Sequence, residues 1–366
     1  MECRICGRDG AAKVLGVCVS CVRERPEEAL EHAMRGHERA RGVYALPAEP
    51  PRSVGAAGAR RCRLCANECV LAPGERGYCG VRENADGKLK NIFPKGYAML
   101  HAYEDPLPTN CCAAWFCPGS QAGAAKRMVN VAVFFYGCNF DCLFCQNESH
   151  KELWRAPLVK LEDFVSGIRN NRRAYCVCYF GGSPEPQLPF AIKASEMLVR
   201  EGVVGDGGVR RKPRICWEWN GCGNRSLVRK AAALSLESGG IVKFDLKAFD
   251  ENLSLALSGV SNRRAFENFE MIARDFFEGS NPPVLTATTL LVPYYVDEEE
   301  VGKIAEFIAN LNPDIPYSLL IFHPDFLMDD LPITPRSQVE RCYKAAKRHL
   351  NNVNIGNKHL LAWAPP

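Results

Sequence analysis

The sequence predicts an α/β protein in which a partial (β/α)6 barrel follows cysteine-rich metal-binding modules. Three observations predict this fold. From Met128 onward, short β-rich runs alternate with amphipathic segments, as expected for βα units that build a parallel sheet. Before that point the cysteines fall in short-spaced clusters, which is typical of metal thiolates. A linker rich in Pro, Ala and Gly, residues 47–60, marks a boundary between two modules.

The composition is that of a sizeable globular protein. Its 366 residues are 47% hydrophobic, which is enough for one large core and a smaller appendage. The formal net charge of +4 is too small to indicate a nucleic-acid partner, and we expect none. The sequence has no run of 18 or more apolar residues, and it opens with Cys3 and Cys6 where a signal peptide would carry an apolar core. We therefore expect a cytoplasmic protein without a transmembrane segment.

The first module, residues 1–46, combines four cysteines with a charged, helix-prone stretch at residues 26–41. The cysteines form two C-x2-C pairs, Cys3 with Cys6 and Cys18 with Cys21. Two such pairs are the pattern of a zinc ribbon or a rubredoxin-like centre, and we favour zinc over iron.

A second cysteine-rich segment, residues 61–127, contains two further groups of cysteines. The first group is Cys62, Cys65, Cys69 and Cys79. Its spacing fits a structural zinc or an auxiliary 4Fe-4S cluster, and we narrowly favour the cluster. The second group is Cys111, Cys112 and Cys117. It is either part of a packed apolar loop that closes the barrel, or a further cluster or reactive thiol near the substrate, completed by Cys222.

The remaining residues, 128–366, are expected to form a partial TIM-like barrel. Strands are expected at residues 130–136, 175–180, 214–219, 241–246, 285–292 and 317–322, and helices at residues 158–169, 189–200, 226–236, 264–274 and 298–311. Cys176 and Cys178 are two apart on one strand, so they point the same way, and we expect both in the core. Cys342, in a C-terminal helix, is expected to be a small buried hydrophobe. In such barrels the chemistry lies at the carboxyl ends of the strands.

The loop after the first barrel strand contains three cysteines in a C-x3-C-x2-C pattern: Cys138, Cys142 and Cys145. Three thiolates can hold three irons of a 4Fe-4S cube and leave the fourth iron open to a substrate or cofactor. A zinc site would normally require a fourth protein ligand. The spacing and its position at the barrel's catalytic end therefore favour a catalytic iron–sulfur cluster.

With this motif on its first strand, the barrel resembles the radical S-adenosylmethionine (SAM) superfamily. Three further segments strengthen the resemblance because each follows a successive strand. They are Gly181-Gly182-Ser183-Pro184, Glu218-Trp219-Asn220-Gly221 and Asp245-Leu246-Lys247. Together they are similar to the pyruvate formate-lyase-activating branch and its AmmeMemoRadiSam relatives. The similarity extends from Cys62 to the C-terminus.

The resemblance implies that the chain binds a 4Fe-4S cluster and SAM. It implies that Phe144 lies against the adenine and that the backbone of Gly181, Gly182 and Ser183 holds the amino group of SAM. It also implies that Glu218, Asn220, Asp245 and Lys247 recognise the methionyl and ribose parts. The sequence departs from the family at Ser183, where many relatives carry an acidic residue, and at Trp219, which replaces threonine. We therefore expect backbone contacts, and no side-chain role in binding SAM or a cation, at these two positions.

The resemblance also implies the reaction class. A reductant such as ferredoxin or flavodoxin would supply one electron, and SAM would be cleaved to a 5′-deoxyadenosyl radical that takes hydrogen from an unactivated carbon, under anaerobic conditions. We expect a large protein, peptide or lipid substrate. The alternatives are activation of a glycyl-radical enzyme, carbon–carbon or carbon–sulfur bond formation on a lipid or peptide, and a non-catalytic iron–sulfur or zinc adaptor.

Overall fold

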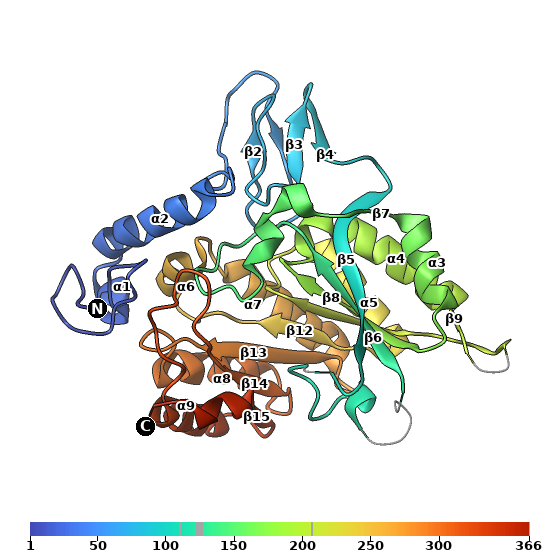
Figure 1. Cartoon of the computed structure of the whole chain (residues 1–366). Coiled ribbons are helices and arrows are strands. Elements are labelled where there is room, and N and C mark those ends of the chain that lie inside the picture. The colour runs from blue at the N-terminus through green and yellow to red at the C-terminus, as the bar shows by residue number, and fades with distance from the viewer. Residues whose placement is uncertain (110, 122–126, 206–207, 366) are drawn as a thin grey trace.

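The computed structural model describes residues 1–109, 111–121, 127–205 and 208–365. A nine-stranded sheet runs through the molecule in the order β15-β14-β13-β12-β11-β8-β6-β5-β7 (Figure 1). Seven of its strands lie parallel to their neighbours: β6 (Val129–Phe135), β8 (Ala174–Gly181), β11 (Arg214–Trp219), β12 (Val242–Asp245), β13 (Leu285–Leu291), β14 (Tyr317–Ile321) and β15 (Val353–Gly356).

The first six of these strands correspond to the six that the sequence predicts, so the expected α/β fold with a large parallel sheet is confirmed. The seventh parallel strand, β15, was not predicted because it is short and only half-buried along its length. At the other edge, β5 (Tyr97–Pro106) pairs antiparallel with β6, and β7 (Leu158–Lys160) pairs antiparallel with β5. Residues 158–160 were expected to begin a helix, but their pairing with β5 makes them a strand.

Helices follow the strands, as βα units require. Five match predicted segments: α3 (Leu161–Asn170), α4 (Leu188–Glu201), α5 (Arg225–Ser238), α7 (Arg263–Ile272) and α8 (Glu298–Leu311). A π-helical turn, Ala273–Phe277, continues α7, and α9 (Arg336–Lys347) buries Cys342 in the core as expected. An additional short helix, α6 (Glu251–Ser258), begins at Asp250, whose carboxylate accepts a hydrogen bond from the backbone N–H of Leu253 at 2.8 Å. No helix of the described residues is long and apolar enough to cross a membrane.

The cysteine-rich segments lie against the barrel. The first contains α1 (Val19–Glu24) and α2 (Pro26–Gly42), both of which contact α6. The second contains two hairpins, β1 (Arg60–Arg61) with β2 (Val70–Leu71) and β3 (Arg82–Ala85) with β4 (Lys88–Asn91), beside the carboxyl end of β6 (Figure 1). A third small hairpin, β9 (Val203–Val204) with β10 (Arg210–Arg211), follows α4.

Buried polar contacts dock the first module onto the barrel. The Tyr295 hydroxyl accepts a hydrogen bond from the backbone N–H of Ala12 at 2.8 Å and donates one to the Val17 carbonyl at 2.8 Å. Arg23 of α1 forms ion pairs with Asp297 at 2.9 Å and with buried Glu300 at 3.0 Å. These contacts hold the four cysteines of this module at a defined place beside the loop between β13 and α8.

The two faces of the barrel sheet differ in chemistry. Side chains alternate along a strand, so one face packs on the helices and the other lines the barrel interior. Towards the helices, Tyr179 of β8 stacks on Trp217 of β11 at a ring-centroid distance of 4.6 Å, and Trp217 donates a hydrogen bond to Ala231 of α5. Towards the interior, Cys178 and Lys243 face a cavity. Cys176 and Cys178 do point the same way, and both line this cavity; Cys178 is buried as expected, whereas Cys176 is only half-buried.

Candidate active site

The three cysteines of the C-x3-C-x2-C motif lie in the loop after β6, here called the cluster loop (residues 137–147). They share a cavity of about 180 Å³ with segments that follow β8, β11 and β12. The predicted residues that line this cavity, here called the SAM cavity, are Cys138, Cys142, Cys145, Phe144, Gly181, Gly182, Ser183, Glu218, Asn220, Asp245 and Lys247. Residues from four separate places in the sequence therefore meet at the carboxyl end of the sheet.

Of the three cysteines of the cluster loop, Cys138 is buried, and Cys142 and Cys145 are half-buried. Burial raises the pKa of Cys138 and Cys142, and raises that of Cys145 to about 12. Without a metal these thiols are neutral, so binding of a metal or cluster would release their protons. Lys247 lies close enough to Cys142 and Cys145 to favour their thiolates electrostatically. The donor set and its charge environment fit an iron–sulfur cluster with one open iron.

Glycine at position 182 allows the second-strand loop to lie directly on the cluster loop. A Cβ atom at Gly182 would collide with the carbonyl oxygen of Gly137 and lie 2.9 Å from the ring of His150. Gly181 has a φ of +108°, and a Cβ there would come within 2.6 Å of the Phe135 backbone nitrogen. The packing of the chain thus requires glycine at both positions, whether or not a cofactor also lies close to them.

Asn220 connects three of the segments around the cavity. Its side-chain amide donates hydrogen bonds to the Asn139 side chain at 2.8 Å and to the Ser183 hydroxyl at 3.0 Å. Its side-chain oxygen accepts one from the backbone N–H of Cys222 at 2.9 Å. Ser183 in turn donates a hydrogen bond to Glu185, so its side chain is used within the protein. The side chains of Asn220 and Ser183 therefore link the loops after β6, β8 and β11 by hydrogen bonds.

Glu185 is a site residue that the motif analysis did not single out. Its buried carboxylate accepts a hydrogen bond from the backbone N–H of Gly221 at 2.8 Å. Burial raises the pKa of Glu185 to about 7. The carboxylate joins the loop after β8 to the loop after β11 and so fixes the wall of the SAM cavity opposite the cluster loop.

Asp245 and Lys247 form an ion pair at the end of β12. The Lys247 ammonium also lies 5.4 Å from the centroid of the Phe144 ring. Burial acts to lower the pKa of Lys247, but the charges of Asp245 and Cys142 raise it overall, so Lys247 stays cationic. One Asp245 oxygen is buried without a hydrogen-bond partner, so this carboxylate retains an unused acceptor in the cavity wall.

Asp141, between two cysteines of the motif, is the second site residue that sequence reasoning missed. Its buried carboxylate contacts three basic side chains: His37 at 2.8 Å, Lys151 at 2.6 Å and Arg41 at 3.5 Å. Burial alone would raise the pKa of Asp141, but these partners outweigh it and lower the pKa to about 2. Since His37 and Arg41 both belong to α2, the first module holds the cluster loop. The sequence shows that His37 and Arg41 are spaced i,i+4 and so share a face of the helix. It does not show that Asp141, about 100 residues further along, is their common partner.

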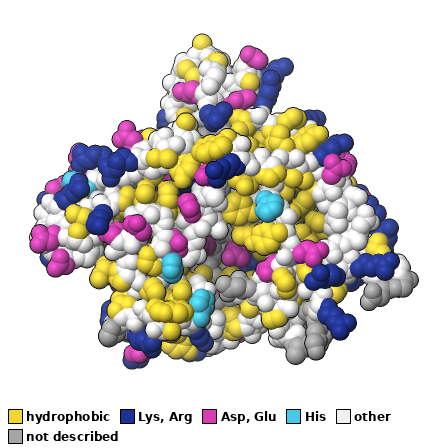
Figure 2. Space-filling model, in the orientation of Figure 1, with side chains coloured by type: hydrophobic (Ala, Val, Ile, Leu, Met, Phe, Trp, Pro, Cys, Tyr) yellow, Lys and Arg dark blue, Asp and Glu magenta, His cyan; other side chains and the backbone are white. Residues whose placement is uncertain are grey.

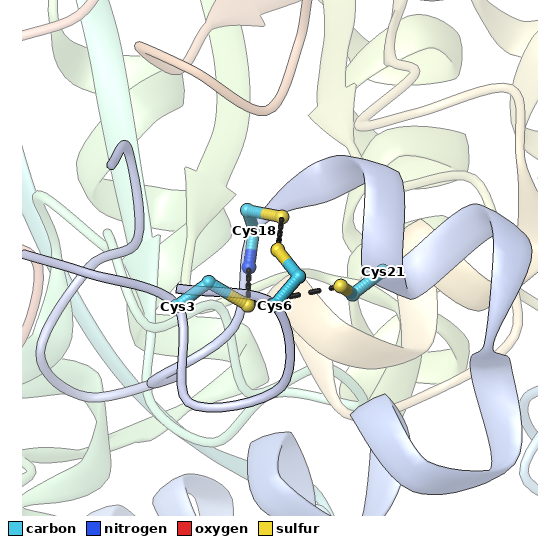
Figure 3. Close-up of side chains that lie close together, drawn as sticks. All are labelled: Cys3, Cys6, Cys18 and Cys21. Carbon is cyan, nitrogen blue, oxygen red and sulfur yellow. Dashed lines mark hydrogen bonds between the residues drawn. The ribbon is translucent and has the colours of Figure 1, made fainter. Parts of the chain in front are cut away.

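The four cysteines of the first module form a compact group (Figure 3). The sulfurs of Cys3 and Cys21 are 3.7 Å apart, as are those of Cys6 and Cys18, and all four lie within 4.8 Å of one another. A tetrahedral ion with metal–sulfur bonds of about 2.3 Å has sulfur–sulfur edges of about 3.8 Å. A hydrogen bond from Arg8 lowers the pKa of exposed Cys6 to about 6. The group can hold one tetrahedral metal ion.

The group of Cys62, Cys65, Cys69 and Cys79 lies directly against the cluster loop. The backbone N–H of Ala66 donates a hydrogen bond to the carbonyl of Cys222 at 2.8 Å, and Asn67 donates one to the carbonyl of Asn139 at 2.7 Å. Burial first, and then the other three thiols, raise the pKa of Cys65. Within the described chain these four sulfurs are not among the groups gathered within 4.8 Å. They are neighbours, but spaced more widely than the ligands of one ion.

Cys111, Cys112 and Cys117 lie in the barrel interior, beside a cavity that Cys176, Cys178 and Cys216 also line. The pKa of Cys111 is lowered to about 6. The hydrogen bond from Cys112 is the main cause, and the charge of Lys243 adds to it, whereas burial acts in the opposite direction. Cys222 does not complete this group. Its sulfur is fully buried 3.7 Å from the carbonyl of Ser261, and its backbone pairs with the segment that contains Cys65.

Comparison with known proteins agrees with this geometry. The profile of the radical SAM superfamily matches residues 132–308. An uncharacterised protein of Methanocaldococcus jannaschii is 24% identical over 317 residues, which cover 81% of each chain. A second protein of that organism, provisionally named a glycyl-radical enzyme activating enzyme, is 25% identical over 191 residues, or 52% of this chain and 66% of its own. A pyruvate formate-lyase-activating enzyme of Staphylococcus aureus is 24% identical over 217 residues, or 56% of this chain and 78% of its own.

The matched profile spans the strands and loops that build the SAM cavity, from within β6 to within α8. Residues 132–308 form a radical SAM domain.

Proposed function

We propose that the protein is a radical SAM enzyme that abstracts hydrogen from an unactivated carbon of a large substrate. The observation that carries this proposal is the SAM cavity, where three cluster-loop thiols face the glycine pair after β8 and the Asp245–Lys247 pair after β12. When bound, the 4Fe-4S cluster would supply one electron to SAM, whose C5′–S bond then breaks to give methionine and a 5′-deoxyadenosyl radical.

The chain's own residues would hold the cofactors and exclude water. Cys138, Cys142 and Cys145 are the proposed iron ligands. Gly181 and Gly182 expose backbone groups to the amino group of SAM, because neither carries a side chain. Asp245 and Lys247 offer opposite charges to the polar parts of SAM.

Further residues would orient the adenine and position the loops. Phe144 offers an apolar face to the adenine. Glu218 is the last of the polar residues that the family resemblance implies for SAM binding, and it also lines the cavity. Asn220, through Ser183 and Asn139, keeps the loops in register around the cofactor.

An aromatic surface beside the SAM cavity supports a large substrate. His101, Tyr103, Phe134, Tyr136 and Phe180 form a chain of ring contacts with centroid distances of 5.5 to 6.3 Å. Tyr103 is 44% exposed, and Phe180, whose ring contacts that of Tyr103, lines the SAM cavity. Hydrophobic side chains gather over β5 on this face of the molecule (Figure 2). A protein, peptide or lipid docked here would reach the cavity at Phe180.

A second candidate function is the activation of a glycyl-radical enzyme. The names of two relatives favour it, since one is a pyruvate formate-lyase-activating enzyme and the other is named as an activating enzyme. In that case the hydrogen would come from a glycine of a partner protein. The two cysteine-rich modules of this chain contribute eleven further thiols outside the cluster loop, which favours a different large substrate as the first choice.

We assign the other cofactors from sulfur geometry. The 3.7 Å sulfur pairs of Cys3, Cys6, Cys18 and Cys21 suit a single zinc ion. The wider group of Cys62, Cys65, Cys69 and Cys79 suits an auxiliary 4Fe-4S cluster, because each thiolate of a cube binds a different iron. Its contact with the cluster loop suits electron transfer from a ferredoxin- or flavodoxin-type reductant.

The experiment is SAM cleavage by the anaerobically reconstituted protein with dithionite. We expect 5′-deoxyadenosine and methionine from the native chain, and neither from the Cys138→Ala, Cys142→Ala, Cys145→Ala triple variant. Undiminished 5′-deoxyadenosine from that variant would overturn the proposal. A persistent glycyl-radical EPR signal in a co-purifying protein would select the second candidate.

A further inference from the structure

A second cavity, of about 140 Å³, lies in the barrel interior next to the SAM cavity. We call it the thiol chamber, because five cysteines line it: Cys111, Cys117, Cys176, Cys178 and Cys216. Cys112 adjoins Cys111 at its wall. Phe180 and Glu218 line both cavities, so the two share a wall. None of these six thiols belongs to the groups assigned above to zinc or to iron–sulfur clusters.

The chamber wall contains polar groups that do not suit an apolar core. Lys243 on β12 is only 2% exposed, and its ammonium lies 3.1 Å from the Cys178 sulfur, 3.4 Å from the Cys111 sulfur and 3.1 Å from a Glu218 oxygen. A buried ammonium is costly unless anions surround it. The Glu218 carboxylate supplies one such anion, and the sulfurs of Cys111 and Cys178 lie where further negative charge would be stabilised.

Three of these groups have the geometry of metal ligands. The sulfurs of Cys111 and Cys112 and a carboxylate oxygen of Glu218 all lie within 4.8 Å of one another. Cys111 and Cys112 come from the segment before β6 and Glu218 from the end of β11, so the fold brings the ligands together. Among the described residues, this is the one group within that distance besides the first-module cysteines.

We propose that the thiol chamber binds one divalent transition-metal ion through Cys111, Cys112 and Glu218, with a fourth coordination position open to the chamber. Two thiolates and a carboxylate carry three negative charges. A divalent ion and the Lys243 ammonium carry three positive charges, so the ion with its ligands and Lys243 is neutral as a whole. Ions of the zinc and ferrous type accept thiolate and carboxylate oxygen together, and three protein ligands with an open position are typical of sites that bind a further ligand.

Lys243 acts in this site as an outer hydrogen-bond donor. It contacts the sulfurs of Cys111 and Cys178 and the carboxylate of Glu218. Lys243 thereby orients two of the proposed ligands, Cys111 and Glu218, without occupying the position of the ion. Cys178, Cys176 and Cys216 lie on neighbouring strands and form the soft, apolar wall around the open position. A ligand that carries a thiolate or carboxylate donor is the class that this position would accept.

The test is metal analysis of the anaerobically purified full chain. We expect the Cys111→Ser, Cys112→Ser double variant to contain about one divalent ion per chain less than the native protein, with unchanged acid-labile sulfide. Cys176→Ser is the matched control, because Cys176 lines the same chamber but lies outside the ligand group, and it should keep the ion. An unchanged ion count in the double variant would overturn the proposal. Loss of about four irons with their sulfide would also overturn it, since that outcome indicates a cluster.

A second measurement does not depend on the variants folding. The native protein is treated with a chelator, then labelled with iodoacetamide with or without added Zn²⁺, and the label on Cys111 is measured by mass spectrometry. Zn²⁺ should protect Cys111 at least several-fold while leaving the labelling of Cys117, outside the ligand group, unchanged. Equal labelling of Cys111 under both conditions would identify a reactive thiol without a metal and reject the site. Both readouts are independent of SAM cleavage, so their failure and that of the proposed function are distinguishable.

Discussion

His37 Nδ1 lies 2.8 Å from Asp141 Oδ2, and neither side chain is exposed to solvent. His37 also contacts the Ala256 carbonyl of α6 at 3.0 Å through Nε2. One imidazole thus joins α2 of the first module, α6 of the barrel and the loop that carries the proposed iron ligands. The first module is therefore part of the support of the candidate active site.

Removing this imidazole should weaken the cluster loop. We expect His37→Ala to lower the free energy of unfolding by about 1.5–3 kcal/mol, the usual value of a hydrogen bond to a charged group. Lys151 and Arg41 keep Asp141 ionised, so the loop should loosen without collapsing. Urea unfolding of the reconstituted protein measures the change. The control is His32→Ala on the same helix, whose imidazole contacts Arg35 near the surface; equal stability of both variants would contradict the proposed support.

Gly182 gives a test of loop packing that leaves every ligand in place. A Cβ in Gly182→Ala would press on the Gly137 carbonyl, so we expect a displaced cluster loop, a lower iron content after reconstitution and a lower melting temperature. Gly167→Ala on α3 is the matched change, because a Cβ there meets nothing within 4 Å. It should be neutral or stabilise the helix by up to about 1 kcal/mol. Identical iron contents in the two variants would show that iron binding does not depend on the close contact between Gly182 and the Gly137 carbonyl.

Much of this architecture could be predicted from the sequence, because the signals are local. Six β-rich runs separated by amphipathic segments predicted the six strands, and the motifs at their ends predicted which residues line the SAM cavity. Strand β5 was missed because, after its first buried residues, it is largely exposed and carries no clear alternation.

Long-range contacts could not be predicted in the same way. Nothing near Asp141 in the sequence indicates that two of its three partners lie on residues 26–42, and nothing near Lys243 indicates that it will be buried among thiols. Cys176 and Cys178 were expected only to lie in the core, and nothing in the sequence singled out Cys216. Only the closing of the sheet brings them together with the segment that contains Cys111.

The ion pair at the end of β12 should contribute to SAM affinity. We expect Asp245→Ala to bind SAM about 10- to 100-fold more weakly, which corresponds to one charge-assisted hydrogen bond, and to keep the cluster. Titration of SAM, followed through the cluster's EPR signal, measures the affinity. Asp275→Ala, which removes an exposed carboxylate paired with Arg229, serves as the control. Unchanged affinity in the Asp245 variant would mean that this carboxylate only positions Lys247.

Iron stoichiometry should decide the nature of the second cysteine group. If Cys62, Cys65, Cys69 and Cys79 hold a cube, the native protein should contain about eight irons and the triple cluster-loop variant about four. A zinc ion there would instead leave about four irons in the native protein and almost none in the triple variant. The Cys62→Ala, Cys65→Ala double variant should also be less stable, because this turn-rich segment buries little core of its own. Native metal content and melting temperature in that variant would exclude a metal site in this segment.

The last prediction links the metal of the first module to the active site. Cys18 lies at the start of α1 and Cys21 within it, and α2 follows directly, so loss of the metal should release the helix that carries His37. We expect the Cys18→Ala, Cys21→Ala double variant to lose about one zinc ion and also to bind less iron in the cluster loop. Cys342→Ala removes a buried cysteine of α9 that belongs to none of the proposed ligand groups, and it should change neither count.

Combining these substitutions with His37→Ala gives a mutant cycle. Because both changes act through α2, their effects on unfolding free energy should be less than additive, by about 0.5–3 kcal/mol. Simple additivity, or full cluster iron in the variant without the first-module metal, would show that the first module does not support the cluster loop.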